Sequence, residues 1–96
     1  MAEYVLTGPA LRDLDAIYRY VYRDSGLTRA NHVRARLYEA FDDLARLPSL
    51  GHPRPDVRRG DYLFWTVFRY EIVFRRKPHV VISRVIHGAR DVPRRL

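Results

Sequence analysis

The residues best suited to chemistry lie near the C-terminal end of the chain, in the stretch Val80–Asp91. This stretch begins as a β-branched apolar run and then gathers Arg84, His87, Arg90 and Asp91. Histidine can move a proton near neutral pH, and arginine can hold a phosphate or carboxylate through two parallel hydrogen bonds. A strand that ends in such a cluster usually delivers it to the rim of a sheet, where a substrate or partner can reach it. Acid–base chemistry and anion binding are therefore the first hypotheses.

Cleavage of a phosphodiester would need a base for the 2′-hydroxyl, an acid for the leaving oxygen and cations for the charged intermediate. A ribonuclease could recruit His87, Arg84, Arg69 and Glu71 for these tasks. Each of these residues also has a structural interpretation. His87 is typical of a strand-end histidine that bonds the following turn, and Glu71 favours a cross-strand pair with Arg84 or a neighbouring arginine. Arg90 and Asp91 can form a local turn pair, and Arg90 is alternatively a contact to a target.

The remaining histidines and aromatic residues suggest no further site. His32, His52 and His79 have no metal-ligand spacing and the chain has no cysteine, so we expect no metal site, and we expect no cofactor. Trp65, with Phe64 and Phe68, could stack on nucleic-acid bases, but such a run is more typical of a core.

Two helices are expected to position these groups. From Ala10 to about Asp24, apolar residues recur at spacings of three and four, which predicts an amphipathic helix capped by Thr7. A second apolar stripe predicts a helix from Thr28 to Leu47. A linker of only three or four residues makes the two helices antiparallel neighbours.

A short strand at Tyr4–Leu6 precedes the helices, and three runs rich in aromatic and β-branched residues follow them, at Tyr62–Val67, Tyr70–Arg75 and Val80–His87. Their short connections require antiparallel pairing of these three. The order β-α-α-β-β-β predicts an α+β fold in which an antiparallel helical hairpin packs on one face of a mainly antiparallel sheet. Alternation in Tyr70–Arg75 places Tyr70, Ile72 and Phe74 toward the helices. It leaves Arg69, Glu71, Val73 and Arg75 on an outward face that is charged and partly apolar. Val80–His87 is apolar on both parities, so the face that carries Arg84 stays open.

Composition limits the class of protein. At 96 residues the chain has room for one domain, and its 47% hydrophobic content fits a packed globule. It shows no signal peptide, no transmembrane run and no cysteine, so we expect a soluble, cytoplasmic protein with no membrane association. Residues 1–51 are neutral, whereas residues 52–96 carry the whole net charge of +7, almost all of it on arginine. This charge is either a solvated basic surface or a site for an anionic partner.

The sequence resembles the ParE/RelE superfamily of toxins from type II toxin–antitoxin systems, closest to the ParE-like members. The opening Tyr4-Val-Leu-Thr7 with Ala10 and Asp13-Leu14 resembles the start of such toxins, and Leu44-Ala45 before Pro48 and Gly51 resembles their middle. The ending Ile82-Ser-Arg84-Val-Ile-His87-Gly-Ala-Arg-Asp91 is the most specific match.

The resemblance implies a bacterial toxin held inactive in a hetero-oligomer by a cognate antitoxin, ParD-like or another small antitoxin. ParE-like toxins poison DNA gyrase, which would leave this chain with no catalytic residues, whereas RelE-like toxins cleave messenger RNA on the ribosome. The RelE-like pattern has an arginine in an aromatic-Arg-apolar-apolar-aromatic segment, and here Tyr70–Phe74 carries Glu71 at that position. This departure favours gyrase, with the ribonuclease as the alternative and an orphan toxin that only binds antitoxin as a third possibility. Candidate contacts to target or antitoxin are Arg58, Arg59, Arg69, Arg75, Arg84 and Arg90.

Overall fold

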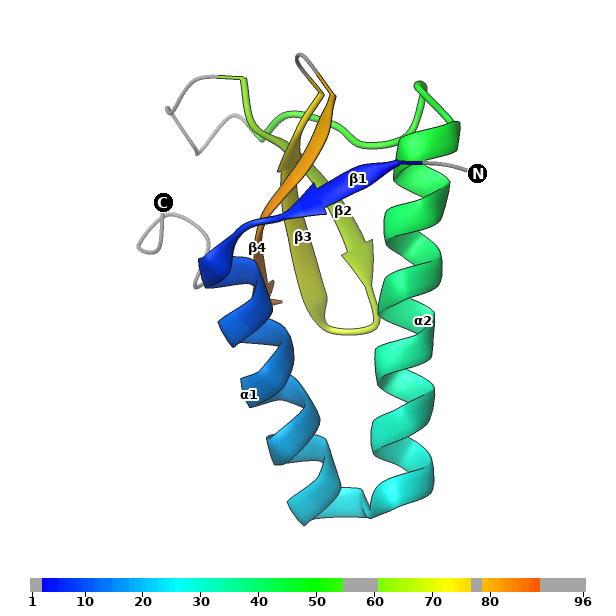
Figure 1. The fold of residues 1–96 in the computed structure, drawn as a ribbon, viewed down its shortest axis with the longest axis vertical. Helices are drawn as coiled ribbons and strands as arrows, with labels where there is room; N and C mark the ends of the chain where they lie inside the picture. The colour runs from blue at the N-terminus through cyan, green and yellow to red at the C-terminus, as the bar shows by residue number, and fades with distance from the viewer. Residues whose placement is uncertain (1–2, 55–60, 77–78, 89–96) are drawn as a thin grey trace.

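The computed structural model describes residues 3–54, 61–76 and 79–88 of the protein. Its elements are β1 (Tyr4–Leu6), α1 (Gly8–Ser25), α2 (Leu27–Arg46), β2 (Leu63–Val67), β3 (Tyr70–Arg75) and β4 (Val80–His87). The predicted order β-α-α-β-β-β is confirmed. The two helices meet at Gly26, beyond the end of the sheet, and diverge from there so that the sheet lies at the wide end of the hairpin (Figure 1).

The four strands form one sheet in the order β1-β4-β3-β2. The pairs β2–β3 and β3–β4 are antiparallel, as their short connections require, and β1 pairs in parallel with β4. The register of β3 with β4 shifts between Val73 and Phe74, where Ser83 is the extra residue. Such a bulge reverses the alternation of side chains along the strand. It explains why Val80–His87 reads as apolar on both parities.

The hairpin is tighter than the sequence analysis predicted. The linker is Gly26 alone, at φ 91°, instead of three or four residues. Thr7 caps α1 as predicted, because its hydroxyl accepts a hydrogen bond from the Ala10 amide at 3.1 Å. The second helix begins at Leu27, one residue before the predicted Thr28, and it has no side-chain cap. A glycine at positive φ can end one helix and start the next within a single residue.

The main core lies between the helices and the sheet. Ile72 and Phe74 of β3 are fully buried in it, as the alternation predicted, and Tyr70 packs against its edge. Other members come from every remaining element except β1, whose Tyr4 and Leu6 pack against it; they include Leu14, Val33, Leu37, Phe41, Leu44, Val67, Ile82 and Val85.

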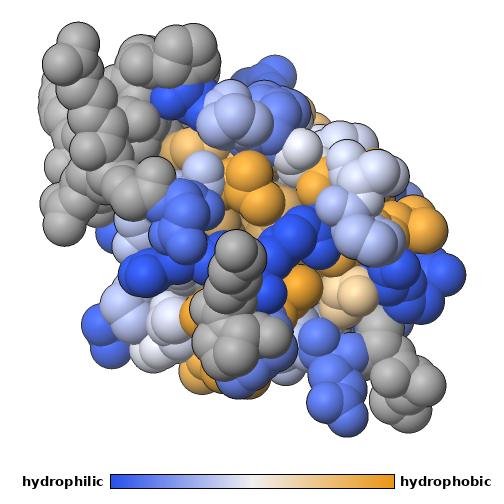
Figure 2. Space-filling model, turned by 90° about the horizontal axis from the view of Figure 1, so that it is seen from above, coloured by the Kyte–Doolittle hydropathy of each residue, from blue (hydrophilic) through white to orange (hydrophobic). Residues whose placement is uncertain are grey.

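The opposite face of the sheet is not the exposed charged face that was predicted. Val73 is fully buried there with Phe64 and Ile86, and Tyr62 packs against them. Arg54 lies over the Phe64 ring at 5.7 Å, and the strand edge at Phe64 pairs with His52 through two backbone hydrogen bonds. The prediction failed because alternation assigns a side chain to a face but does not reveal what covers that face. From the loop end, the surface shows hydrophilic side chains among small apolar areas (Figure 2).

The C-terminal end of α2 is held by one arginine. Arg76 donates hydrogen bonds to the carbonyl oxygens of Leu44, Leu47 and Leu50, at 2.9, 3.1 and 2.7 Å. The carbonyls of Leu44 and Leu50 lie at the end of the helix and in the turn after it, where an intrahelical partner is lacking, whereas the Leu47 carbonyl also accepts the Leu50 amide at 3.1 Å. Neither helix in the described residues combines the length and apolar character that crossing a membrane demands.

Candidate functional site

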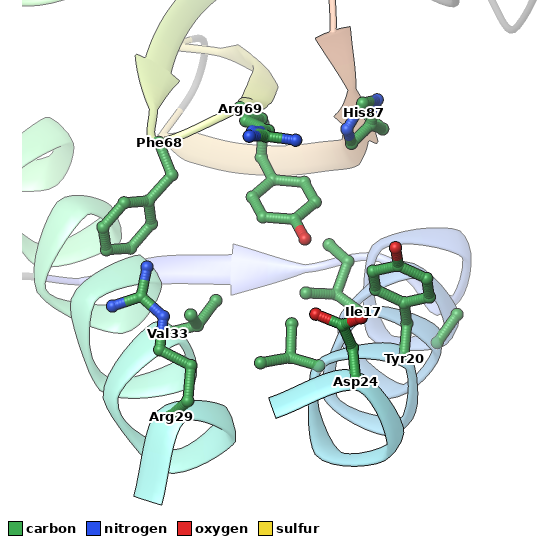
Figure 3. Close-up of a pocket in the computed structure, with 11 residues that line it drawn as sticks. Ile17, Tyr20, Asp24, Arg29, Val33, Phe68, Arg69 and His87 are labelled. Carbon is green, nitrogen blue, oxygen red and sulfur yellow. The ribbon is translucent and has the colours of Figure 1, made fainter. Parts of the chain in front are cut away.

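A cleft of about 520 Å³ opens between the helical hairpin and the end of the sheet. The helices supply an apolar floor that includes Ile17, Val21 and Val33. The β2–β3 turn and the end of β4 supply Phe68, Arg69 and His87 on the opposite side (Figure 3). Tyr20, Asp24 and Arg29 extend from the helices toward them. The remaining lining residues are Ala16 and Tyr70.

Aromatic contacts organise the polar side chains of the cleft. The Arg29 guanidinium lies 5.2 Å from the centre of the Phe68 ring, and His87 meets Tyr70 edge to face at 5.8 Å. Gly88 donates its amide to the Arg69 carbonyl at 2.7 Å, which fixes the end of β4 beside the β2–β3 turn. Burial raises the pKa of Tyr70, and the nearby Tyr20 adds to the rise while Arg69 and Arg29 oppose it. Tyr70 is therefore a neutral hydrogen-bond donor at physiological pH.

The structure brings together only two of the four residues that a ribonuclease would use. His87 and Arg69 both line the cleft. Arg84 lies on the same strand as His87 but forms an ion pair with Asp13 of α1. Glu71 lies in β3, where it is hydrogen-bonded to Thr66 of β2. Neither Arg84 nor Glu71 is among the described residues that line the cleft.

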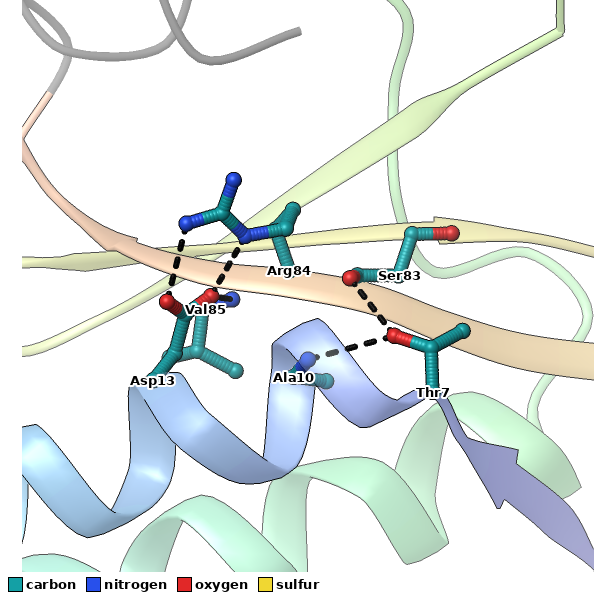
Figure 4. Close-up of polar contacts among 6 residues, drawn as sticks. All are labelled: Thr7, Ala10, Asp13, Ser83, Arg84 and Val85. Atoms are coloured by element: carbon teal, nitrogen blue, oxygen red, sulfur yellow. Dashed lines mark hydrogen bonds and ion pairs between the residues drawn. The ribbon is translucent and has the colours of Figure 1, made fainter.

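Arg84 is engaged by Asp13 in a bidentate ion pair (Figure 4). Its Nε and Nη2 donate to the two carboxylate oxygens at 2.7 and 2.9 Å, and the Val85 amide donates to the same carboxylate at 2.9 Å. Arg84 is in register with Val73, so its backbone position belongs to the face away from the main core, and the guanidinium reaches α1 past the edge of β4. The hydrogen bond to Asp13 raises the pKa of Arg84, although partial burial opposes the rise.

These bonds close the edge of β4 beyond the end of β1. The Thr7 amide donates to the Ile82 carbonyl at 3.1 Å, and its hydroxyl donates to the Ser83 carbonyl at 2.9 Å (Figure 4). The Asp13 carboxylate then accepts a hydrogen bond from the Val85 amide, the next donor along that edge. An edge strand with unpaired backbone groups invites wrong pairing, so the cluster is a structural device. Arg84 stays charged but is paired with the Asp13 carboxylate, so it is not a free phosphate-binding cation.

The predicted pair between Glu71 and an arginine is wrong. Glu71 is buried, with 8% of its surface exposed, and its Oε2 accepts a hydrogen bond from the Thr66 hydroxyl across the β2–β3 pair. Its other oxygen, Oε1, has no hydrogen-bond partner among the described residues. A carboxylate in this position cannot serve as a base for a substrate in the cleft.

The remaining arginine candidates are scattered or not described. Arg75 is exposed, and its guanidinium lies 4.6 Å from the Tyr62 ring and donates to the Tyr62 hydroxyl at 3.0 Å. Arg58, Arg59 and Arg90 lie outside the described residues, as does Asp91.

Among residues 3–54, 61–76 and 79–88, no group of three His, Cys, Asp or Glu side chains could hold a metal ion.

The sequence analysis missed the contributions of Tyr20, Arg29 and Phe68 to the cleft. Phe68 was expected in the core, but 44% of its surface is exposed, and its φ of 54° is one that bulky residues rarely adopt. Phe64 is buried as expected, and Trp65 is partly buried against the core. The two-residue spacing between the strand runs signals a tight turn, and a tight turn places an aromatic residue outside the core.

The fold is that of a small α+β protein in which a helical hairpin covers a four-stranded sheet, and comparison with known proteins identifies its class. The family model described as "ParE toxin of type II toxin-antitoxin system, parDE" matches residues 4–92. The chain therefore belongs to the ParE toxin family of type II toxin–antitoxin systems.

Two individual proteins are similar over almost the whole chain. Toxin ParE3 of Caulobacter vibrioides is 30% identical over 97 residues, a match that spans 100% of this chain and 96% of that protein. A solved structure titled "Chromosomal ParDE TA system from P. aeruginosa" shares the fold with a TM-score of 0.77 and 24% identity, over 92% of this chain and 97% of that one.

Proposed function

We propose that this toxin inhibits growth by binding and poisoning DNA gyrase, without catalytic residues of its own. The observation that carries the proposal is the pairing of Arg84, whose guanidinium forms a bidentate ion pair with Asp13. In the ribonuclease hypothesis Arg84 would be one of the cations that stabilise a charged phosphorane, and its pairing with Asp13 removes it from that role. With Glu71 buried against Thr66 as well, two of the four candidate catalytic groups cannot reach a substrate in the cleft.

A cognate antitoxin, ParD-like or another small antitoxin, holds the toxin inactive in a cytoplasmic hetero-oligomer. The net charge of +7 supports this partner, because an acidic segment that folds as it binds would be attracted to such a surface. The match to a solved ParDE system points the same way. Growth unaffected by expression without antitoxin would instead indicate an orphan toxin.

A ribosome-dependent ribonuclease is the second candidate, and one observation favours it. His87 and Arg69 share the cleft with Arg29, so a proton-transfer group does lie beside two cations. This mechanism predicts messenger RNA cleavage in a translating extract that is lost in His87→Ala.

The deciding experiment measures both activities of one purified sample. Supercoiling inhibition and trapped cleaved DNA–gyrase complexes, with messenger RNA intact, are the expected result. Messenger RNA cleavage by the unmodified toxin, absent in His87→Ala and accompanied by unimpaired gyrase, would contradict the proposal.

A further inference from the structure

Charge is segregated along the helical hairpin. Residues 16–36, which form its closed half around Gly26, hold five arginines and one acid. Residues 3–15 and 37–54, which include the open half, hold six acids and three arginines. The first 51 residues have no net charge. The separation of charge becomes apparent only when the hairpin is divided into the half near Gly26 and the half at its open end. The closed half extends beyond the sheet and is therefore accessible (Figure 1).

One surface of the closed half gathers arginine, tyrosine and asparagine side chains. The Arg34 guanidinium lies 4.6 Å from the Tyr18 ring, and the Tyr18 hydroxyl donates to Asn31 Oδ1 at 2.8 Å. Arg34 also donates to Asn31 Oδ1, at 3.4 Å, so these contacts join the two helices. A shallow groove on α1 runs alongside. We call this set the arginine–tyrosine patch; it comprises Tyr18, Arg19, Tyr22, Arg23, Asn31 and Arg34.

The cations of this patch are only weakly engaged by acidic side chains of the described residues. Arg23 and Arg34 make no ion pair within the part of the chain that the structure describes. Arg19 pairs with Asp15 at 3.0 Å, but both side chains are more than half exposed. An exposed pair of this kind contributes little and can be exchanged for a phosphate. Three arginines of the patch can thus contact phosphates, and only the weak pair between Arg19 and Asp15 must be broken.

The composition of the patch favours a phosphate backbone over an acidic peptide. Arginine, tyrosine and asparagine are side-chain types that contact DNA phosphates, and the guanidinium fits them bidentately. The groove on α1 is lined by Tyr18, Arg19, Tyr22 and Arg23, so two of its four side chains carry a guanidinium that can meet a phosphate. None of the six residues lines the cleft that holds His87.

We propose that the arginine–tyrosine patch binds the phosphate backbone of duplex DNA, independently of base sequence. The inference rests on the proposed function only for the source of that DNA, which is the segment that gyrase cleaves. A toxin that touches both the enzyme and its DNA would stabilise the cleaved complex. Binding by three arginines alone is weak, so it acts only where gyrase has already concentrated the two partners.

The test is the salt dependence of binding to a fluorescent duplex, measured by anisotropy on the full-length toxin. Three neutralised phosphates predict a slope of log K against log[salt] of about −2.7, and Arg23→Gln or Arg34→Gln should each bring it nearer zero by about 0.9. At 50 mM salt each variant should bind about tenfold more weakly. Arg34→Lys should keep the slope. Arg12→Gln is the matched control, because Arg12 is an exposed arginine of the same helix as Arg23 but lies in the acidic half.

Equal losses in Arg23→Gln and Arg12→Gln would overturn the proposal, since binding would then follow net charge alone. So would binding to polyglutamate with no binding to the duplex, which would indicate an acidic peptide as partner. A thermal scan of each variant confirms that it is folded. Failure of the unmodified toxin to inhibit gyrase would refute the proposed function but leave the duplex-binding result standing, so the two failures are distinguishable.

Discussion

Removing the Asp13 carboxylate should destabilise the protein more than any other single change on the surface of α1. Asp13→Ala leaves the Arg84 guanidinium and the Val85 amide without their shared acceptor. The side chains of Arg84 and Asp13 are only 21% and 15% exposed, so water replaces the lost bonds incompletely. Breaking a buried ion pair from one side costs about 3–5 kcal/mol, and the partial exposure of Arg84 lowers the expected loss to about 2–4 kcal/mol.

The loss can be measured by urea unfolding followed through Trp65 fluorescence. A total stability of about 5–15 kcal/mol makes such a change large, and it corresponds to a fall in Tm of roughly 10–25 °C. Asp15→Ala is the matched control on the same helix, because its pair with Arg19 is exposed and should contribute about 0.5 kcal/mol or less. Asp13→Ala combined with Arg84→Ala should recover part of the loss, since no buried charge is then left unpaired.

Equal unfolding free energies for Asp13→Ala and Asp15→Ala would refute this reasoning. It would mean that the Arg84 guanidinium is satisfied by solvent, and the case against its use as a catalytic cation would fall with it.

Three further predictions test other features of the fold. Gly51→Ala should cost about 2–4 kcal/mol, because Gly51 has φ 92° and an added Cβ would overlap the Phe74 ring. Gly26→Ala has nearly the same φ but open space, so it should cost about 1–3 kcal/mol from backbone strain alone and less than Gly51→Ala. Equal losses in urea unfolding would contradict the steric argument. Phe68→Asn should leave the free energy of unfolding unchanged or raise it, because asparagine tolerates the φ of 54° better than phenylalanine does. A decrease of more than about 1 kcal/mol in urea unfolding would show that Phe68 is a packing residue. Tyr70→Phe should change the alkaline limb of stability: the folded pKa of Tyr70 is raised above 10.0, so its contribution is fully present below that pH and is lost as pH rises through the folded pKa. The phenylalanine variant should therefore gain stability relative to the unmodified protein above about pH 10 in a pH series of thermal scans, and a constant difference between the two proteins would show that burial does not act on this phenol.

The fold was predictable because its signals are local. Spacings of three and four mark both helices, and alternation in β3 assigned Ile72 and Phe74 to the core correctly. The single-residue linker at Gly26 was missed, because the sequence marks a helix end without fixing how soon the next helix begins.

The environment of the candidate site depends on contacts that no local pattern reveals. Asp13 and Arg84 are 71 positions apart, and the sequence indicated Arg84 as a binding group or as a partner of Glu71, but not as a partner of Asp13. The burial of Glu71 follows from what covers the outer face of the sheet, which alternation cannot show. The cleft arises because the helical hairpin extends beyond the sheet (Figure 1). The lengths of the predicted elements did not reveal how far the hairpin would extend.

The most direct test of the central claim is a gyrase supercoiling assay on the purified toxin, run beside a translating extract that reports messenger RNA cleavage. Inhibited supercoiling with trapped cleaved DNA, intact messenger RNA and equal potency for His87→Ala are the results we predict. Normal supercoiling together with messenger RNA cleavage that His87→Ala abolishes would contradict the claim that this ParE-family toxin acts by binding alone.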